Sequence, residues 1–378
     1  MVSKVFAERR PIRVAFMLYE LPFWKNEALF KVMQQDNRFL PAFWIMDMPA
    51  ISNPDIKKEV HNACVEYVKK NKYPYFEDIS LSKLKEEFAP DYVFVVHPYN
   101  DHIPFTVDAI KEGLFCYIPY AYCSLASPRM YVDSKIKYFY RYYVESVYIQ
   151  QEARKYMLNH AINTKITGLP MADYLSSKKS GYVESNRKCI IWAPHWSIRN
   201  HTGGTLDVST FLQIADGMLK LVGKYSSQVD FVFKPHPLLK RYLYNDRDWG
   251  KERTDAYYRE WVEGENTSLE EGDYVDLFVK SDAIIHDSCS FIQEYLLMNK
   301  PCMYMVRIDG KSKLNYAAQK ALECYLLGFC VEDIEHFVYD VLTGEDKMAT
   351  KREEFLHSNL ISSGSSAVQN IIMDLLNP

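Results

Sequence analysis

Short apolar runs alternate with longer segments of helical periodicity along the first half of the chain. Continuous apolar runs at 13–18, 39–46, 92–96, 115–118 and 164–167 predict strands. Between them, apolar residues recur three and four positions apart over 55–69 and 80–88, which predicts helices. Because these strands are apolar throughout instead of alternating, we expect a parallel sheet covered on both faces.

The second half repeats this pattern after a break. Residues 176–187 are polar, contain Gly and Ser and have no period, which predicts a domain boundary. Strands are then predicted at 189–193, 229–233, 283–285 and 301–305, and helices at 206–222, 274–280, 316–327, 331–341, 351–355 and 365–376. The charged stretch after 237 is expected to be irregular. The length of 378 residues agrees with two α/β domains, 1–176 and 188–378, with a last helix that is free to cross back to the first.

The stretch 279–304 joins two of these strands through a polar turn. It reads VKSDAIIHDSCSFIQEYLLMNKPCMY, with a strand, the cluster HDSCS, and then apolar residues at helical spacing. Ser288 or Ser290 is placed to cap the helix, and the free N–H groups of such a terminus form a site for phosphate. A serine-capped helix that binds nothing explains this stretch alone equally well.

Composition and charge narrow the class of protein. Hydrophobic residues make up 48% and charged residues 25% of the chain, as in an ordinary globular protein. The formal net charge of -4 gives no electrostatic case for nucleic acid as a partner. Eight cysteines without CxxC spacing indicate reduced thiols in a cytosolic protein, not structural zinc or a disulfide framework.

Two segments bear on membranes. The start, MVSKVFAERRPIRVAFML, places bases before an apolar run, but Glu20 and Pro22 interrupt the run and no cleavage site follows, so we predict a strand instead of a signal peptide. No segment approaches about 18 uninterrupted apolar residues. Residues 129–148 mix bases with tyrosines and predict a helix, which either lies against an anionic membrane surface or is partly buried in the protein. We therefore expect a cytoplasmic protein, with peripheral contact to the inner face of the cell membrane as an option.

Polar side chains follow several predicted strands. Because ligands of open α/β sheets lie beyond the carboxyl ends of the strands, these side chains should share one rim in each domain. In the second domain they are Lys234, His236, His195, Ser197, Asp287, Ser288 and Ser290, with Glu294 one helical turn further on. In the first domain they are His97, Asp101 and His102. Imidazole and ammonium groups there can donate to phosphate, and Glu294 can accept from ribose hydroxyls; the alternatives are structural loop histidines and a solvated helix residue.

Several common motifs are absent from the sequence. It has no Gly-x-x-x-x-Gly-Lys-Ser/Thr and no Gly-x-Gly-x-x-Gly, which argues against a P-loop ATPase or a dinucleotide oxidoreductase. It has no Gly-x-Ser-x-Gly elbow, which argues against an α/β hydrolase. Because no Asp-rich metal cluster follows a strand, we expect no required metal or cofactor.

Four segments, in this order, resemble the C-terminal half of the CDP-glycerol glycerophosphotransferase family, the teichoic-acid polymerases and their relatives. They are ITGLPMADYL (166–175), IWAPHWS (191–197), FKPHP (233–237) and SDAIIHDSCSFIQEYLLMNKPCMYM (281–305), and SGSSAVQNII (363–372) resembles the closing helix. The resemblance implies the GT-B fold, in which two Rossmann-like domains with parallel sheets face each other across a cleft.

The resemblance assigns roles to four residues. His236 matches the histidine of the family's His-Pro motif, which contacts the donor phosphates. Asp287 and Ser290 match the Asp and the second Ser of its Thr-Asp-Tyr-Ser-Ser motif, and Glu294 falls at a usually acidic position.

The sequence also departs from the family pattern. His286, Ser288 and Cys289 replace Thr, Tyr and the first Ser of that motif. The family's His-Gly-Thr-Pro-Leu-Lys motif, which supplies the proposed base, is absent, and the nearest equivalent, AYCSLASPRM (121–130), has no histidine. Bacterial polysialyltransferases and capsule-type Kdo transferases, which are similar to this sequence in their His-Pro and Ser clusters, are built on GT-B as well.

The sequence therefore predicts a GT-B transferase that moves a sugar or polyol phosphate from a nucleotide-activated donor, CDP-glycerol-like or CMP-linked. The acceptor is a cell-surface polysaccharide or teichoic-acid-like glycan, free or lipid-linked. His236 is the catalytic residue of the second domain, and His97, Asp101 or His102 is the base. The alternatives are a polysialyl- or Kdo-type glycosyltransferase, a polysaccharide pyruvyl transferase, and a non-catalytic glycan- or nucleotide-sugar-binding protein.

Overall fold

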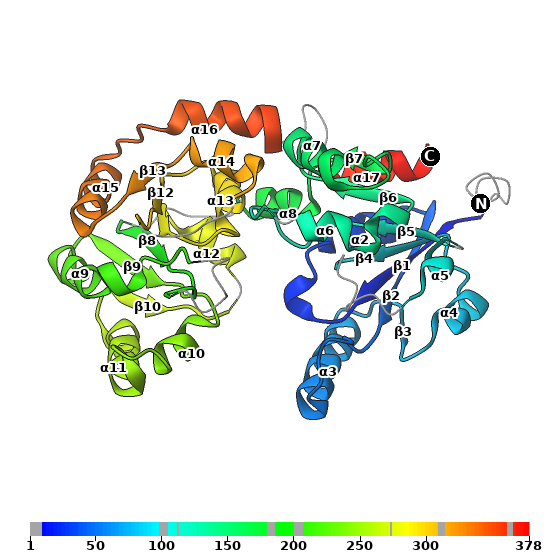
Figure 1. Ribbon diagram of the computed structural model, residues 1–378, viewed down its shortest axis with the longest axis horizontal. Helices are drawn as coiled ribbons and strands as arrows, with labels where there is room; N and C mark the ends of the chain where they lie inside the picture. Colours follow the sequence, from blue (N-terminus) through cyan, green and yellow to red (C-terminus); the bar gives the residue numbers. More distant parts are fainter. Residues whose placement is uncertain are drawn as a thin grey trace. The chain divides into compact units, whose positions relative to one another are not determined.

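The chain forms two compact α/β units (Figure 1). The computed structural model describes residues 10–97, 105–111, 113–126, 128–179, 186–199, 207–272, 274–308, 314–360 and 366–377. The first unit comprises Met1–Tyr122, Ser127–Tyr174 and Asn359–Pro378, and the second comprises Cys123–Ala126 and Leu175–Ser358. The last helix, α17 (Ala367–Leu376), is therefore part of the first unit.

The first unit is built on a parallel sheet of seven strands in the order β3-β2-β1-β4-β5-β6-β7. The strands are β1 (Ile12–Leu18), β2 (Phe39–Ile45), β3 (Tyr75–Glu77), β4 (Tyr92–Val95), β5 (Leu114–Tyr117), β6 (Arg141–Val144) and β7 (Thr164–Ile166). The helices are η1 (Leu21–Phe23), α2 (Glu27–Gln35), α3 (Pro54–Lys70), α4 (Leu81–Glu87), α5 (Val107–Lys111), α6 (Pro128–Val132), η2 (Lys135–Tyr138), α7 (Val147–Tyr156) and α17. Helix α8 (Pro170–Lys179) spans the boundary to the second unit.

The core of the first unit is rich in aromatic rings. Phe16 of β1 stacks on Phe94 of β4 with 5.0 Å between ring centroids, and it meets Phe30 of α2 edge-on at 5.5 Å. All three side chains are buried. The continuous apolar runs of the sequence therefore became central strands, because both faces of the sheet are covered by helices.

The second unit is built on a parallel sheet of six strands in the order β10-β9-β8-β11-β12-β13. The strands are β8 (Lys188–Ala193), β9 (Val229–Phe233), β10 (Thr267–Leu269), β11 (Ala283–His286), β12 (Cys302–Met305) and β13 (Leu326–Gly328). The helices are α9 (Phe211–Lys224), α10 (Leu239–Tyr244), α11 (Gly250–Glu263), α12 (Val275–Lys280), α13 (Phe291–Glu294), η3 (Tyr295–Met298), α14 (Tyr316–Leu322), α15 (Val331–Thr343) and α16 (Ala349–Phe355), followed by η4 (Leu356–Leu360) at the unit boundary. The strand order reverses between β8 and β11, the position where doubly wound sheets bind ligands.

The core of the second unit is centred on Trp192 of β8. Its ring lies 5.0 Å from Phe233 of β9, 5.6 Å from Phe211 of α9 and 5.5 Å from Trp261 of α11, measured between centroids. These contacts fix the carboxyl ends of β8 and β9, from which two of the predicted site loops start.

The helix predicted over 129–148 is wrong. This segment contains α6, η2 and the strand β6, which lies between β5 and β7 in the sheet. Tyr142 and Tyr143 of β6 are fully buried, because tyrosine rings pack as well on a sheet as on a helix.

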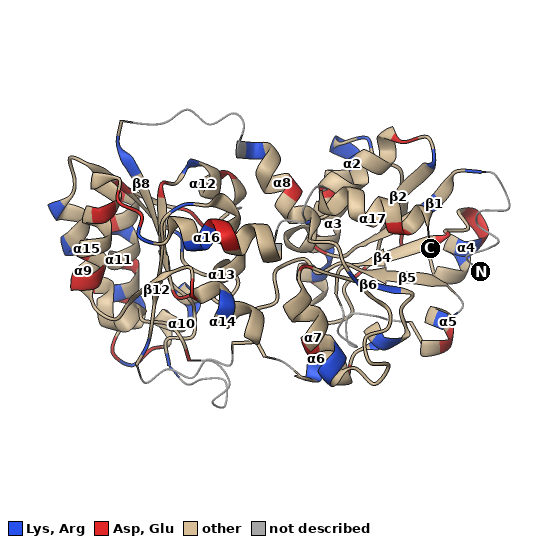
Figure 2. Cartoon of the chain, turned by 90° about the horizontal axis from the view of Figure 1, so that it is seen from above, with Lys and Arg blue, Asp and Glu red and all other residues tan. Residues whose placement is uncertain are grey.

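Three further predictions about the elements are wrong. The charged stretch after 237 holds α10, α11 and β10 instead of irregular chain, and the segment 316–327 holds a short helix followed by β13. Helix α9 begins at Phe211, later than the predicted start at 206. In both units Lys, Arg, Asp and Glu lie mostly on helices and loops (Figure 2). The many charged residues of α11 therefore obscured the apolar periodicity by which a helix is recognised in the sequence. Within the described ranges, no helix combines the length and apolar character needed to cross a bilayer.

Candidate functional site

Three neighbouring strands of the second unit, β9, β8 and β11, carry the predicted site residues at their carboxyl ends. The loop after β8 holds His195 and Ser197, the loop after β9 holds Lys234 and His236, and the turn after β11 holds 287–290. The three loops therefore leave one edge of one sheet, at the point where the strand order reverses.

His195 and His236 lie against each other, with 5.1 Å between ring centroids and an interplanar angle of 61°. In both rings Nδ1 accepts a hydrogen bond from the backbone N–H two residues further on, Ser197 at 3.2 Å and Leu238 at 3.2 Å. The sequences Pro-His-Trp-Ser and Pro-His-Pro-Leu thus fold in the same local way. Because Nδ1 is the acceptor, each neutral ring carries its hydrogen on Nε2 and offers it as a donor.

The two imidazoles are neutral near pH 7. Burial lowers the pKa of His195 to about 3, with a smaller contribution from His236. Burial also lowers the pKa of His236 to about 4, and the charge of Lys234 adds to the effect. The pair therefore presents two uncharged N–H donors in place of one imidazolium.

Asp287 fastens the β8 loop to the start of α9. Its buried carboxylate accepts the backbone N–H of His195 at 2.5 Å, the backbone N–H of Thr210 at 2.6 Å and the hydroxyl of Thr210 at 2.9 Å. Burial raises the pKa of Asp287 to about 6, and these hydrogen bonds oppose the rise. The carboxylate of Asp287 therefore holds the backbone of the β8 loop in place, and with it His195.

The two serines of the turn lie close together, with 3.1 Å between the hydroxyl oxygens of Ser288 and Ser290. Ser288 is buried and Ser290 is exposed. The prediction that Ser288 or Ser290 caps the helix is wrong. Ser290 precedes α13 but has helical dihedral angles and makes no capping hydrogen bond, and α13 has only four residues before it continues as η3. What the turn offers is an exposed hydroxyl at the edge of β11.

Lys234 and Glu294 lie deeper than their predicted roles suggest. The ammonium of Lys234 is buried and donates to the backbone carbonyl of Gly272 at 2.8 Å. Glu294 ends α13 with 1% of its surface exposed, so the alternative of a solvated helix residue is wrong.

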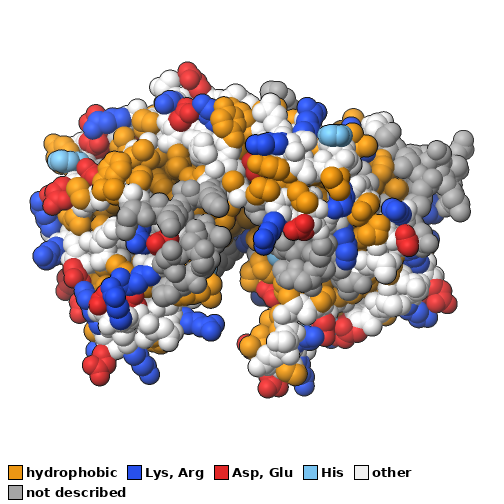
Figure 3. All heavy atoms as spheres, in the orientation of Figure 1, with side chains coloured by type: hydrophobic (Ala, Val, Ile, Leu, Met, Phe, Trp, Pro, Cys, Tyr) orange, Lys and Arg blue, Asp and Glu red, His pale blue; other side chains and the backbone are white. Residues whose placement is uncertain are grey.

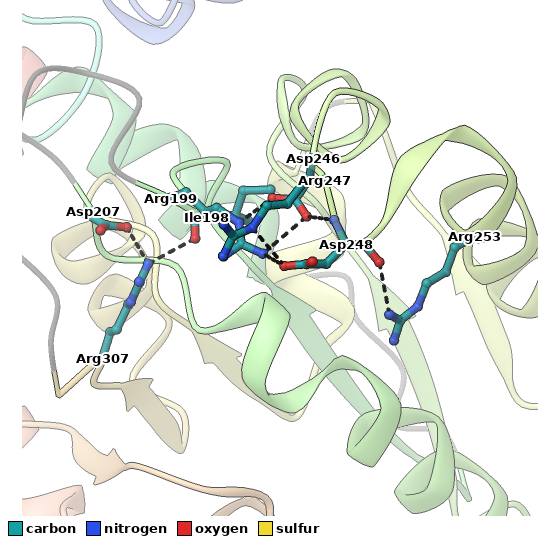
Figure 4. A network of polar contacts seen from close by, with 8 residues as sticks. All are labelled: Ile198, Arg199, Asp207, Asp246, Arg247, Asp248, Arg253 and Arg307. Atoms are coloured by element: carbon teal, nitrogen blue, oxygen red, sulfur yellow. Dashed lines mark hydrogen bonds and ion pairs between the residues drawn. The ribbon is translucent and has the colours of Figure 1, made fainter.

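A network of charged residues, which the sequence reading missed, holds the β8 loop from its other side (Figure 4). Arg307, two residues after β12, donates to the carbonyl of Ile198 at 3.0 Å and pairs with Asp207. Arg199 pairs with Asp246 and with a second carboxylate, that of Asp248. Each of these three carboxylates is 47 or more positions away from the arginine with which it pairs, so no local motif could have revealed the network.

The first unit holds the candidate bases. His97 follows β4 and is buried. Its ring meets Phe23 edge-on with 4.2 Å between centroids, and it lies tilted against Tyr120 with 4.9 Å between centroids. Asp101 and His102 lie outside the described residues.

Comparison with known families matches the central part of the chain. The family model described as CDP-Glycerol:Poly(glycerophosphate) glycerophosphotransferase matches residues 132–312, just under half of the sequence. The matched part contains four of the five predicted segments in full, among them those with His195, His236 and Ser290. No curated protein matches the chain.

Solved structures resemble the chain over nearly its whole length. A UDP-GlcNAc 2-epimerase from Neisseria meningitidis, bound to UDP-GlcNAc, has a TM-score of 0.62 at 14% identity, and the match covers 97% of this chain and 100% of the other. A UDP-GlcNAc 2-epimerase from Methanocaldococcus jannaschii has a TM-score of 0.61 at 11% identity, with 97% and 100% covered. A variant of the wall teichoic acid polymerase TagF has a TM-score of 0.61 at 13% identity, with 97% and 88% covered.

At these identities the solved structures establish the fold, and the family model adds the sequence signature. The predicted architecture of two parallel-sheet α/β domains of the GT-B kind is confirmed. The predicted resemblance to the CDP-glycerol glycerophosphotransferases is likewise confirmed over residues 132–312, and the comparisons support a transferase.

Proposed function

We propose that the protein transfers a polyol phosphate or a sugar from a CDP- or CMP-linked donor to a cell-surface glycan, free or lipid-linked. The observation that carries this proposal is the His195–His236 pair at the strand-order reversal of the second unit. Two Nε2–H donors at this edge suit the oxygens of a phosphate or diphosphate, and the exposed hydroxyl of Ser290 lies at the end of β11 on the same edge.

The same two donors would serve both reactions. In polyol phosphate transfer, an acceptor hydroxyl oxygen attacks the outer phosphorus of the donor, and the bond from this phosphorus to the CMP oxygen breaks. In glycosyl transfer, the bond between the anomeric carbon and the phosphate oxygen of CMP breaks. In both reactions negative charge grows on the CMP phosphate, and preorganised N–H donors from His236 and His195 stabilise it.

The acceptor hydroxyl must lose its proton to a base. We propose that this base comes from the first unit, from His97, Asp101 or His102. Of the three, His97 is the one whose surroundings are described, and its ring is held by Phe23 and Tyr120. Glu294 and Lys234 remain proposed contacts of the nucleotide.

The test begins with nucleotide binding. Thermal shift and calorimetric titration with CMP, CDP, UDP and GDP identify the nucleobase of the donor, because a ligand that binds only the folded chain raises its melting temperature. We expect cytidine nucleotides to bind. His236→Ala should weaken this binding at least about tenfold, which corresponds to the loss of one or two hydrogen bonds. His236→Gln should retain part of the affinity, because the glutamine amide also offers an N–H donor. His336→Ala, which removes an exposed histidine from α15 of the same unit, is the matched control.

Turnover then separates the proposal from its alternatives. CDP-glycerol, CMP-sialic acid, CMP-Kdo and phosphoenolpyruvate, each with a panel of glycan acceptors, distinguish glycerophosphotransfer, the two glycosyl transfers and pyruvyl transfer. Tight nucleotide binding without turnover of any donor would favour a non-catalytic binding protein. Absence of any nucleotide binding by the wild-type protein would refute the site itself.

We also propose that the first unit docks on an anionic membrane, through a surface other than the helix that the sequence predicted. Leu158 and Ile162, in the turn after α7, are 73% and 84% exposed. The side-chain amide of Asn159 between them donates to the carbonyl of Lys137, which joins this turn to η2 and its exposed Tyr138.

Charge complementarity favours a membrane as the partner of this surface. Residues 128–166 contain seven Lys and Arg against three Asp and Glu, in a chain whose net charge is -4. Figure 3 shows basic and hydrophobic side chains interspersed over α6 and α7. Apolar side chains that enter the headgroup region beside lysines are typical of proteins that bind anionic lipid surfaces.

A further inference from the structure

Three carboxylates surround one histidine at the carboxyl edge of the sheet in the first unit. Asp47 lies two residues after β2, Glu77 ends β3, and Asp78 follows it. His61 comes from α3, the helix that connects these two strands. The four residues are spread over 32 positions of the chain, and the β2-α3-β3 crossover brings them together.

The imidazole forms the base of this cluster and the carboxylates its rim. His61 is 9% exposed, whereas Asp47 and Asp78 are exposed to solvent. Its Nδ1 lies 3.1 Å from Oδ1 of Asp47, and its Nε2 lies 3.4 Å from Oε1 of Glu77 and 3.6 Å from Oδ2 of Asp78. Exposed carboxylates therefore converge on a ring that is almost fully buried.

The contacts between His61 and the carboxylates are not good hydrogen bonds. The buried Nδ1 of His61 has no hydrogen-bond partner, although Asp47 is near it. The two contacts of Nε2 are longer than the 2.7–3.2 Å of a good N–H···O bond. Ligand atoms that share a metal with bonds of about 2.0–2.2 Å lie about 3–3.5 Å apart, and the 3.1 Å between Nδ1 of His61 and Oδ1 of Asp47 matches this spacing.

We propose that Asp47, His61 and Asp78 bind a divalent first-row transition metal such as Zn²⁺ or Mn²⁺. One donor atom from each of these residues lies within 4.8 Å of the others, and Glu77 adds a carboxylate next to Nε2. An imidazole nitrogen with carboxylate oxygens is a ligand set for these ions, whereas Mg²⁺ and Ca²⁺ prefer oxygen alone. With the metal on Nδ1, Nε2 still faces the carboxylate of Glu77, the usual kind of partner of a metal-bound histidine.

The metal would tie α3 to the ends of β2 and β3. None of its ligands belongs to the donor site of the second unit, so this proposal is independent of the proposed transferase function. Its expected effect is on the stability of the first unit, because an ion that binds the folded cluster and not the unfolded chain raises the melting temperature.

The test is a titration of the full chain, stripped with a chelator, with ZnCl₂ and with CoCl₂. We expect saturable binding of one ion, d–d absorption of bound Co²⁺, a raised melting temperature, and little effect of MgCl₂ or CaCl₂. Asp47→Asn and Asp78→Asn should each weaken Zn²⁺ binding at least about tenfold. All proteins in the titration carry Cys330→Ser, because Cys330 is an exposed free thiol and thiolates are ligands of Zn²⁺.

Glu66→Gln is the matched control, because it removes another exposed carboxylate from α3. Since Asp47 and Asp78 are exposed, their variants should keep the fold, which circular dichroism checks; His61→Gln is a second variant that removes the nitrogen ligand. The proposal is refuted if the wild-type chain takes up no Zn²⁺, which would leave an ion-pair cluster only. It is equally refuted if the three variants bind Zn²⁺ as tightly as the Glu66→Gln control.

Discussion

Asp287 at the end of β11 accepts the backbone N–H of His195 at the end of β8, with 2.5 Å between Oδ1 and the nitrogen. The two residues lie on either side of the point where the strand order of the second unit reverses. Asp287 thus holds the backbone that carries the imidazole of His195, and this imidazole lies against that of His236. The geometry of the two N–H donors consequently depends on a residue that is itself buried.

Asp287→Asn should destabilise the protein and weaken nucleotide binding together. The asparagine amide would turn its N–H₂ group toward the backbone N–H of either His195 or Thr210, so that at least one buried group loses its partner. We expect a loss of about 1–3 kcal/mol in the free energy of unfolding, measured by urea denaturation, and a higher Kd for the cytidine nucleotide.

Thr210→Val is the graded comparison for Asp287. It removes the hydroxyl that donates to the same carboxylate at 2.9 Å and leaves both backbone hydrogen bonds in place. Its cost should be about 1 kcal/mol, with a small effect on nucleotide affinity. If Asp287→Asn abolishes nucleotide binding while stability is unchanged, Asp287 contacts the donor directly and our assignment of a positioning role is wrong.

Acid should destabilise the second unit through His286. This fully buried ring packs between Tyr304 and Tyr325, and burial lowers its pKa to about 3, whereas the unfolded chain takes up the proton near pH 6.5. Between these two values the unfolded state binds more protons, so the free energy of unfolding falls by up to about 1.4 kcal/mol for each pH unit of acidification. Asp287 acts in the opposite direction, because its raised pKa lets the native state take up a proton near pH 6.

His286→Phe isolates this contribution, since it removes the titrating group and leaves Asp287 and the other histidines in place. Urea unfolding at pH 7 and pH 5 should show a smaller loss of stability in the variant than in the wild type. Equal losses in the two proteins would mean that the imidazole is not held neutral in the native state.

Arg307→Met should destabilise the β8 loop and raise the Kd for the cytidine nucleotide. Arg307 and Asp207 are both mostly buried, and the guanidinium also donates to the carbonyl of Ile198. Removal of the guanidinium leaves a carboxylate and a carbonyl without their charged partner, which should cost about 1.5–3 kcal/mol. Calorimetric titration with the nucleotide and urea unfolding measure the two effects.

Arg253→Met is the control for this variant. Arg253 lies in the same network (Figure 4), but its pair with Asp216 is exposed on both sides and should contribute less than about 1 kcal/mol. Comparable losses of nucleotide affinity in the two variants would contradict a specific role for Arg307 in the loop.

Leu158→Ser combined with Ile162→Ser should reduce binding to anionic vesicles. Burial of two such side chains in the headgroup region contributes a few kcal/mol, so we expect a loss of about tenfold or more. Co-sedimentation with phosphatidylglycerol vesicles measures it, and phosphatidylcholine vesicles and added salt test the charge requirement.

Val262→Ser, which removes a side chain that is 62% exposed on α11 of the second unit, should leave vesicle binding unchanged. Wild-type protein that stays in the supernatant with both kinds of vesicle would refute the membrane surface. Retention of binding by the double variant would place the contact elsewhere on the chain.

The sequence by itself determined the α/β class, the strands that end in polar clusters and the family resemblance. It could do so because continuous apolar runs mark strands covered on both faces, and because residues such as His236 and Ser290 follow their strands directly. It failed at 129–148, where tyrosines suit strand and helix alike, and over α11, where charges on the outer face dominate the pattern.

Only the tertiary structure decided how the polar clusters are used. Neighbouring parallel strands share an edge, so Asp287 came to hold His195 over 92 positions of sequence, and Arg307 came to hold Ile198 over 109. The protonation states also depend on the tertiary structure. Burial is the main cause of the lowered pKa values of His195 and His236, with smaller contributions from His236 and Lys234 respectively, and no local sequence pattern encodes burial. Local residue order specifies which groups stand at the strand ends, and the sheet order specifies which of them meet.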